Sequence, residues 1–188
     1  MSITTYSIVL SVMSLGLAGV TILSILGYFF SEEAKERLKA VPYGAWMGLI
    51  GLLAGFSIVG ALIYQYEYLT LTCSLCWWQR IFIFPIALVA SVALYTRSKT
   101  EHLTTALLAV FGLIFALYHY SGHFQKFVLG NSYIIPCSSS ALEPSCSESP
   151  IVIFGFITIP LMGIIALVAI LWLSYLAHQK AKSEQRVV

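Results

Sequence analysis

Residues Gly44–Leu69 read GAWMGLIGLLAGFSIVGALIYQYEYL, with Glu67 as the only charged side chain. A helix of roughly 17–25 apolar residues crosses the hydrocarbon core of a bilayer and satisfies its backbone hydrogen bonds internally. The stretch lacks the period-two alternation that a membrane β-strand would show. It therefore predicts a transmembrane helix.

Four other stretches have the same character: Ile3–Phe30, Trp78–Thr96, Leu103–Tyr120 and Ile151–Ala177. The 188 residues are 59% hydrophobic and only 10% charged, with a mean hydropathy of +0.89. A soluble domain needs more charge to cover its surface, so lipid must be the solvent for much of the chain. The net charge of +2 comes without a basic stripe, which argues against nucleic-acid binding. We expect an all-α membrane protein.

The first stretch differs from a cleaved signal peptide, because no basic segment precedes it, its apolar run is too long and no small-x-small cleavage site follows. We therefore expect it to remain as a transmembrane helix. If all five stretches span, most basic residues fall on one side, and cytoplasmic loops collect Lys and Arg. The opposite connections hold only Arg80 and Lys126. The side expected to be cytoplasmic carries Lys35, Arg37, Lys39, Arg97, Lys99, Lys180, Lys182 and Arg186.

All four cysteines fall on the other side of the membrane in this topology. Cys73 and Cys76 lie in the first outside connection, and Cys137 and Cys146 lie in the second. Disulfides persist in oxidising compartments outside the cytoplasm. Two pairs on that side therefore indicate redox chemistry.

The first pair lies in Thr72-Cys-Ser-Leu-Cys-Trp-Trp-Gln-Arg80, directly before an expected helix. A helix N-terminus carries about half a positive charge, and Arg80 adds a full one. Both favour a thiolate, the reactive form of cysteine, and we assign it to Cys76. Trp77 and Trp78 are typical of membrane interfaces. The sulfur would then lie where a lipid-soluble aromatic oxidant reaches it.

The second pair lies in a connection rich in Ser and Pro, between Pro136 and Pro150. A mobile thiol relay and a structural disulfide fit this connection equally well. A zinc site of all four thiolates is a weaker alternative, because eight residues separate Cys137 from Cys146. Near the end of the fourth stretch, His119 and His123 could donate a hydrogen bond to a quinone, and a solvated interface histidine is an at least equally good interpretation of either.

Taken together, Cys73-Ser-Leu-Cys-Trp-Trp-Gln-Arg80-Ile-Phe-Ile-Phe-Pro85 resembles the signature of the DsbB/BdbC family of disulfide bond formation proteins, particularly its BdbC-like branch. Tyr118-His-Tyr120, the Pro136–Cys146 segment and Gly155-Phe-Ile-Thr-Ile-Pro160 also resemble that branch. The resemblance implies a four-helix transmembrane bundle in a bacterial cytoplasmic (inner) membrane, with both cysteine loops outside the cytoplasm. Ile3–Phe30 would be one additional N-terminal transmembrane helix.

The resemblance also implies a membrane thiol:quinone oxidoreductase that uses ubiquinone or menaquinone. Its partner would be a soluble DsbA-like thioredoxin-fold protein outside the cytoplasm. Cys137 would form the mixed disulfide with the partner, with Cys146 as its mate, and Cys73 and Cys76 would be the quinone-coupled pair. Arg80, Cys76, Trp77 and His119 would contact the quinone.

The expected organisation and two rival functions follow from this pattern. One rival is a vitamin K epoxide reductase-like quinone reductase, whose CxxC is expected within a late helix. The other is a non-enzymatic membrane subunit with two structural disulfides. The expected segments are the additional helix at 1–30, a cytoplasmic connection at 31–43, a catalytic bundle at 44–177 with redox loops at 70–77 and 121–150, and a cytoplasmic tail at 178–188.

Overall fold

The computed structural model describes residues 2–69, 72–131, 146 and 151–185, and within them the chain is almost entirely helical. Five helices are long and apolar enough to cross a membrane, which confirms the expected all-α membrane protein. The helices are α1 (Ile3–Phe30), α2 (Glu32–Ala40), α3 (Tyr43–Tyr66), α4 (Ser74–Thr96), α5 (Glu101–His123) and α6 (Ile159–Gln185), with a π-helical turn η1 (Phe124–Val128) after α5.

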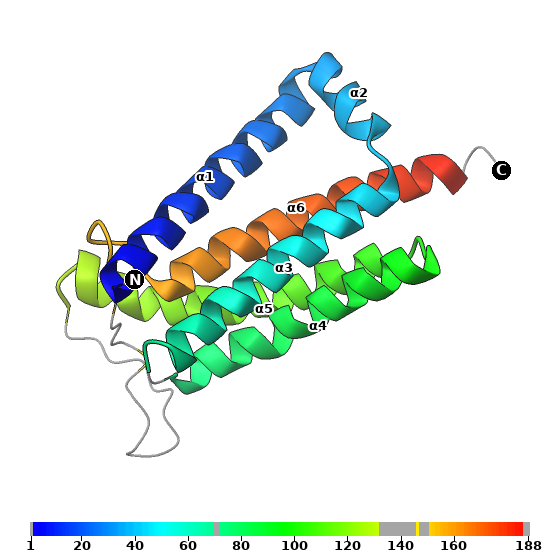
Figure 1. The fold of residues 1–188 in the computed structure, drawn as a ribbon. Coiled ribbons are helices and arrows are strands. Elements are labelled where there is room, and N and C mark those ends of the chain that lie inside the picture. Colours follow the sequence, from blue (N-terminus) through cyan, green and yellow to red (C-terminus); the bar gives the residue numbers. More distant parts are fainter. Residues whose placement is uncertain (1, 70–71, 132–145, 147–150, 186–188) are drawn as a thin grey trace.

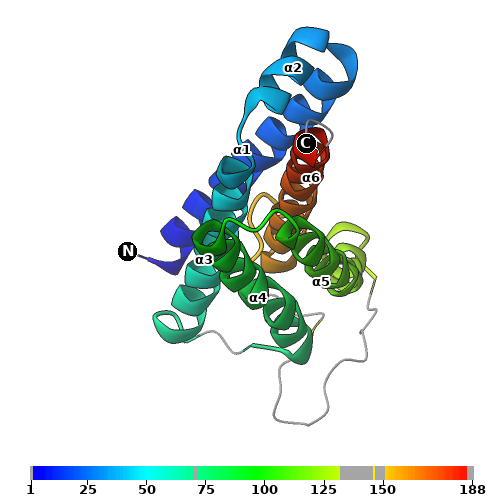
Figure 2. The same cartoon turned by 90° about the vertical axis from the view of Figure 1, so that its right-hand side faces the viewer.

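Four of these helices, α3 to α6, pack side by side as a bundle (Figures 1 and 2). Its core contains Met47, Ile50, Ile86, Leu167 and Ile170, all fully buried. Small residues let the helices approach closely. A Cβ atom at Gly51 of α3 would lie 3.3 Å from the Cβ of Ala90 on α4.

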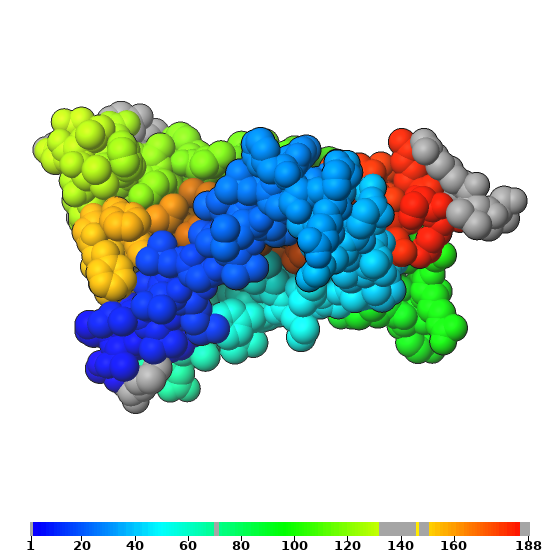
Figure 3. Space-filling view, turned by 90° about the horizontal axis from the view of Figure 1, so that it is seen from above, coloured from blue at the N-terminus to red at the C-terminus, as the bar shows by residue number. Residues whose placement is uncertain are grey.

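α1 and α2 lie outside this bundle (Figure 3). The segment expected to be a simple connection forms α2, because Ser31 caps it and oppositely charged residues three and four apart pair along it. The Ser31 hydroxyl accepts a hydrogen bond from the Ala34 backbone N–H at 3.3 Å. The ion pairs join Lys35 with Glu32, Arg37 with Glu33 and Lys39 with Glu36.

Several helix ends differ from those expected. α3 ends at Tyr66, and α4 begins at Ser74, so Cys76 lies in the first helical turn rather than in a loop. α5 extends to His123, which places His119 well inside a helix. α6 begins at Ile159, and Pro160 in its first turn costs no intrahelical hydrogen bond. The helix continues to Gln185 through the segment expected to be a tail.

The two ends of the bundle differ in chemistry. At one end, Lys99 pairs with Glu184 at 2.6 Å, and the Lys180 ammonium donates to the Lys39 carbonyl at 3.2 Å. Lysines of α2, of the connection between α4 and α5, and of α6 thus lie together at a single end. Cys73, His119 and Cys146 meet at the opposite end.

Candidate redox site

The first cysteine pair begins α4. Cys73 is the N-cap residue of the helix, and its carbonyl accepts the backbone N–H of Cys76 at 3.1 Å. The two sulfur atoms lie 3.3 Å apart, and both cysteines are free thiols. Cys73 is only 5% exposed. The turn of the helix thus holds two sulfurs at a separation from which they can close a disulfide with little movement.

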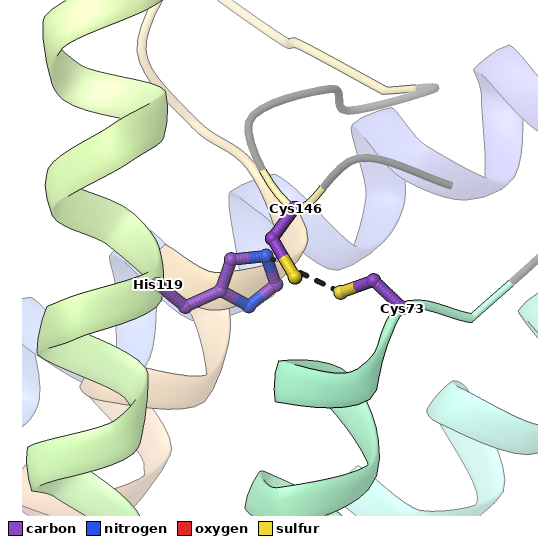
Figure 4. A group of neighbouring side chains, drawn as sticks. All are labelled: Cys73, His119 and Cys146. Atoms are coloured by element: carbon purple, nitrogen blue, oxygen red, sulfur yellow. Dashed lines mark hydrogen bonds between the residues drawn. The ribbon is translucent and has the colours of Figure 1, made fainter. Parts of the chain in front are cut away.

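Cys146 lies beside this pair in space (Figure 4). It is fully buried and disulfide-bonded. The sulfurs of Cys73 and Cys146 and a ring nitrogen of His119 all lie within 4.8 Å of one another. Because a disulfide sulfur is not a thiolate ligand, this arrangement suits thiol–disulfide exchange better than zinc binding. Cys137 lies outside the described residues.

The environment of Cys73 favours its thiolate. A hydrogen bond with Cys76 is the largest cause, and together with His119 it lowers the pKa of Cys73 to about 4 against the opposing effect of burial. The expectation from the sequence was that Cys76, rather than Cys73, carries the stabilised thiolate. The difference arises because α4 starts at Ser74, so that Cys73 takes the N-cap position and contacts His119.

A neighbouring glutamine fixes how His119 faces this sulfur. The amide nitrogen of Gln79 donates to Nδ1 of His119 at 3.0 Å, so the ring proton of a neutral His119 must reside on Nε2. Nε2 lies 3.6 Å from the Cys73 sulfur. Gln79 is therefore a positioning residue that aims an N–H at the thiolate.

Replacing Gln79 with leucine tests this arrangement. Without the amide donor His119 is free to adopt the other tautomer. Below the Cys73 pKa of about 4, at about pH 3, alkylation of reduced Cys73 should slow about fivefold, which corresponds to the loss of one hydrogen bond of about 1 kcal/mol. Peptide mass spectrometry after timed iodoacetamide treatment measures Cys73 separately from Cys76. Gln125→Leu, on η1, is the matched control. Equal rates in Q79L and wild type would refute the positioning role.

Arg80 extends the site away from the cluster of Cys73, His119 and Cys146. It is 8% exposed, and its guanidinium donates to the side-chain oxygen of Gln65 and, at 3.1 Å, to the Ala61 carbonyl. It also lies over the Trp77 ring, 5.1 Å from the centroid. An arginine in a membrane span is costly unless satisfied in this way, so Arg80 is a candidate functional residue.

A cavity of about 800 Å³ opens beside Arg80. Cys73 and Cys76 line it together with Gln79, Arg80 and His119, so most of the residues assigned from the sequence share one cavity. Trp77 is absent from its described lining and instead contacts Arg80.

The sequence left His123, like His119, with two open interpretations, a quinone donor or a solvated histidine, and it gave no role to Gln79 and Gln65. His123 is 2% exposed, and its Nε2 donates to the Cys146 carbonyl at 2.9 Å. Nδ1 of His123 has no hydrogen-bond partner among the described residues, and the side chain lines the cavity. His119 is likewise 2% exposed, so neither histidine is solvated at the interface. For Gln79 and Gln65 the sequence did contain a signal, because a polar side chain inside a predicted membrane helix is energetically costly and often functional.

The sequence profile of the family described as Disulfide bond formation protein DsbB matches residues 44–177. This chain belongs to the DsbB family. The matched segment contains α3 to α5, most of α6 and all four cysteines, whereas α1 and α2 precede it.

Curated relatives carry matching names. The "Disulfide bond formation protein C" of Bacillus subtilis (strain 168) is 31% identical over 137 residues, which is 73% of this chain and 91% of that protein. A "Probable disulfide formation protein" of Coxiella burnetii is 36% identical over 94 residues, half of this chain and 60% of the relative's length. The match thus spans less than two thirds of that relative. No solved structure matches the chain.

Proposed function

We propose that this DsbB-family membrane protein reoxidises a soluble DsbA-like thioredoxin-fold protein and passes the electrons to a membrane quinone. The observation that carries the proposal is the position of the Cys73–Cys76 pair. On one side it adjoins the disulfide-bonded Cys146, and on the other it lines the cavity that contains Arg80. A structural disulfide has no need of such a connection between a second cysteine pair and an apolar cavity.

The proposed exchange conserves electrons and protons at each step. A thiolate of the reduced partner attacks the Cys137–Cys146 disulfide, forming a mixed disulfide with Cys137 and releasing Cys146 as a thiolate. Cys146 then attacks Cys73 of an oxidised Cys73–Cys76 pair and releases the Cys76 thiolate. The second thiol of the partner displaces Cys137, so the partner leaves as a disulfide and two electrons remain on this chain. The Cys137 thiolate then attacks Cys146, which restores the Cys137–Cys146 disulfide and releases the Cys73 thiolate. Closure of the Cys73–Cys76 disulfide would pass the two electrons, together with two protons, to a quinone.

The position of each sulfur suits these roles. Cys73 lies within 4.8 Å of Cys146 and is the sulfur within reach of exchange. Once Cys73 is bound to Cys146, Cys76 is the free sulfur of the pair, and it lines the cavity. His119 donates a hydrogen bond to Cys73 as a leaving thiolate when that bond is broken again.

The residues around the cavity fit a quinone. Arg80 and Gln79 are donors for its carbonyl oxygens. Nδ1 of His123, which has no partner within the described part of the chain, is a buried acceptor suited to the hydroxyl of the reduced quinone. The remaining lining is largely apolar, as most ligand sites are. When bound, ubiquinone or menaquinone supplies a two-electron acceptor that takes up two protons.

This function places the protein in the bacterial cytoplasmic membrane with the cysteines outside. The basic end formed by Lys39, Lys99 and Lys180 then faces the cytoplasm, as the positive-inside rule requires. An outside location for Cys73 and Cys146 matches the compartment in which a thiol oxidase works.

The decisive experiment uses the full chain purified in detergent. Reduced DsbA-like protein and ubiquinone or menaquinone are added, and partner oxidation and quinone reduction are followed together. We expect one quinone reduced per partner disulfide formed. Partner oxidation without quinone loss would refute the electron route. Quinone reduction by small thiols alone, with no reaction of the partner, would favour a vitamin K epoxide reductase-like activity, and no reaction would favour a structural subunit.

Arg80→Gln should weaken quinone binding while leaving the exchange between cysteines intact. Loss of a charged donor costs about 1.5–3 kcal/mol, which corresponds to roughly a tenfold to hundredfold rise in the quinone dissociation constant. Equilibrium titration with ubiquinone measures the constant, and single-turnover oxidation of the partner measures exchange. Arg97→Gln, at the other end of α4, is the control. An unchanged dissociation constant in R80Q would remove Arg80 from the quinone site.

A further inference from the structure

α1 lies outside the segment shared with the DsbB family, yet it is fixed to α3 near its N-terminal end. The Tyr6 hydroxyl donates to the Gly60 carbonyl at 3.3 Å, and the Tyr64 hydroxyl donates to the Ser7 hydroxyl at 3.0 Å. The rings of Tyr6 and Tyr64 meet edge to face, with centroids 5.0 Å apart. Ser7 is fully buried. We call these contacts the outer clasp.

A second set of contacts fixes the other end of α1 to α6. The indole N–H of Trp172 donates to the Ser24 hydroxyl at 2.9 Å. The Tyr28 ring lies edge to face against Trp172, with centroids 5.5 Å apart, and Tyr28 is 8% exposed. We call these contacts the inner clasp. Polar contacts inside a membrane are not replaced by water, so the two clasps define where α1 lies.

Between the clasps one face of α1 lines the cavity, while Ser11 and Thr21 in the same stretch are buried against the protein. Leu10, Met13, Ser14 and Leu17 line it, and a turn beyond Leu17 the side chain of Val20 is 66% exposed. A ligand in the cavity would add van der Waals contacts to these four lining side chains and so to the binding of α1. Figure 3 shows α1 crossing the outside of the molecule between α3 and α6.

The cavity beneath α1 is continuous with the redox site. Its polar end contains Cys76, Gln79 and Arg80, and its apolar part runs past Phe56 of α3 to Leu17 of α1. A membrane quinone has this same division into a polar ring and a long isoprenoid tail. A phospholipid would match the apolar part with its acyl chains and the donors with its ester and phosphate oxygens, but it offers the adjacent Cys76 no electron acceptor.

We propose that α1 forms the membrane-facing wall of the quinone site and holds the isoprenoid tail against α3 and α6. This inference rests on the proposed quinone-dependent function and extends it to a helix outside the shared family segment. The ring then enters and leaves by passing between α1 and the bundle. Helices α3 to α6 carry the redox and quinone-binding residues, and α1 favours the binding of quinones that have a long isoprenoid tail.

Ser14→Phe fills the tail region without touching Cys76 or Arg80. Dissociation constants are measured by equilibrium titration for a long-tailed ubiquinone and its single-isoprenoid analogue, together with the quinone retained through purification. We expect about tenfold weaker binding of the long-tailed form, equivalent to losing burial of about two methylene groups, and little change for the analogue. Val20→Phe, on an exposed part of α1, should behave like wild type.

A second variant tests the outer clasp independently. Ser7→Ala removes the acceptor of the Tyr64 hydroxyl and should speed release of long-tailed ubiquinone about fivefold, the worth of one hydrogen bond. Helical circular dichroism and titration of Cys73 and Cys76 verify folding of both variants.

The outcomes separate the two proposals. If wild type binds neither quinone, the proposed function fails. If wild type binds both but S14F and S7A bind and release the long-tailed form normally, the role of α1 fails while the function stands. If the wild-type cavity holds phospholipid, and wild type binds long-tailed ubiquinone no more tightly than its single-isoprenoid analogue, then α1 covers a lipid site and the inference is overturned.

Discussion

A protein carrying Cys76→Ser and Cys137→Ser is expected to form an intramolecular Cys73–Cys146 disulfide in nearly every molecule on mild oxidation. The two remaining sulfurs lie within 4.8 Å of each other, and a disulfide needs only a small approach from that distance. The hydrogen bond between His119 and Cys73 remains in this protein and still favours the attacking Cys73 thiolate, although the loss of Cys76 raises the pKa of Cys73. Peptide mass spectrometry under non-reducing conditions measures the cross-linked fraction.

The matched control retains Cys76 in place of Cys73. In the Cys73→Ser, Cys137→Ser protein, Cys76 and Cys146 are left, and Cys76 is not part of the close group formed by Cys73, His119 and Cys146. Cross-linking should then be slower by at least about tenfold, because a thiolate must reach its target sulfur for exchange. Equal rates in the two proteins would mean that either sulfur of the first pair receives electrons, and the proposed order of steps would be wrong.

The membrane fold could be predicted from the sequence because it depends on long apolar runs. Each of the five expected stretches corresponds to a helix that meets the length and hydropathy needed to span. The ends of those helices were less accurate, since they depend on capping and on proline rather than on hydropathy. Ser31 starts α2 inside an expected connection, and Pro160 marks the first turn of α6.

The candidate site shows the same division. The spacing of the cysteines and the predicted membrane topology identified Cys73, Cys76, Cys146 and Arg80 as candidate site residues. They could not show that Cys73 rather than Cys76 contacts Cys146 and His119, because this depends on the rotation of α4 relative to α5. That α1 lines the cavity could not be predicted from the sequence either, because no motif marks a helix with this role.

Replacing Cys76 with alanine should raise, by several units, the pH at which Cys73 becomes reactive. The hydrogen bond with Cys76 is the largest cause of the Cys73 pKa of about 4, so its loss returns that pKa toward the ordinary cysteine value of about 8.5. Alkylation of wild-type Cys73 should be half-maximal near pH 4, and at pH 6 the variant should react at least about tenfold more slowly. Iodoacetamide labelling across pH, read by peptide mass spectrometry, measures both curves.

The direction of this shift also fixes a dependence of stability on pH. Because the folded-state pKa of Cys73 lies below its unfolded value, the reduced protein gains stability that is fully present above about pH 8.5 and is lost as the pH falls through about 4. In Cys76→Ala this loss should shrink. Cys76→Ser keeps a hydroxyl donor and should give an intermediate pKa for Cys73. A wild-type labelling midpoint near pH 8 would show that Cys73 is not held as a thiolate, and attack on Cys146 would then need a separate base.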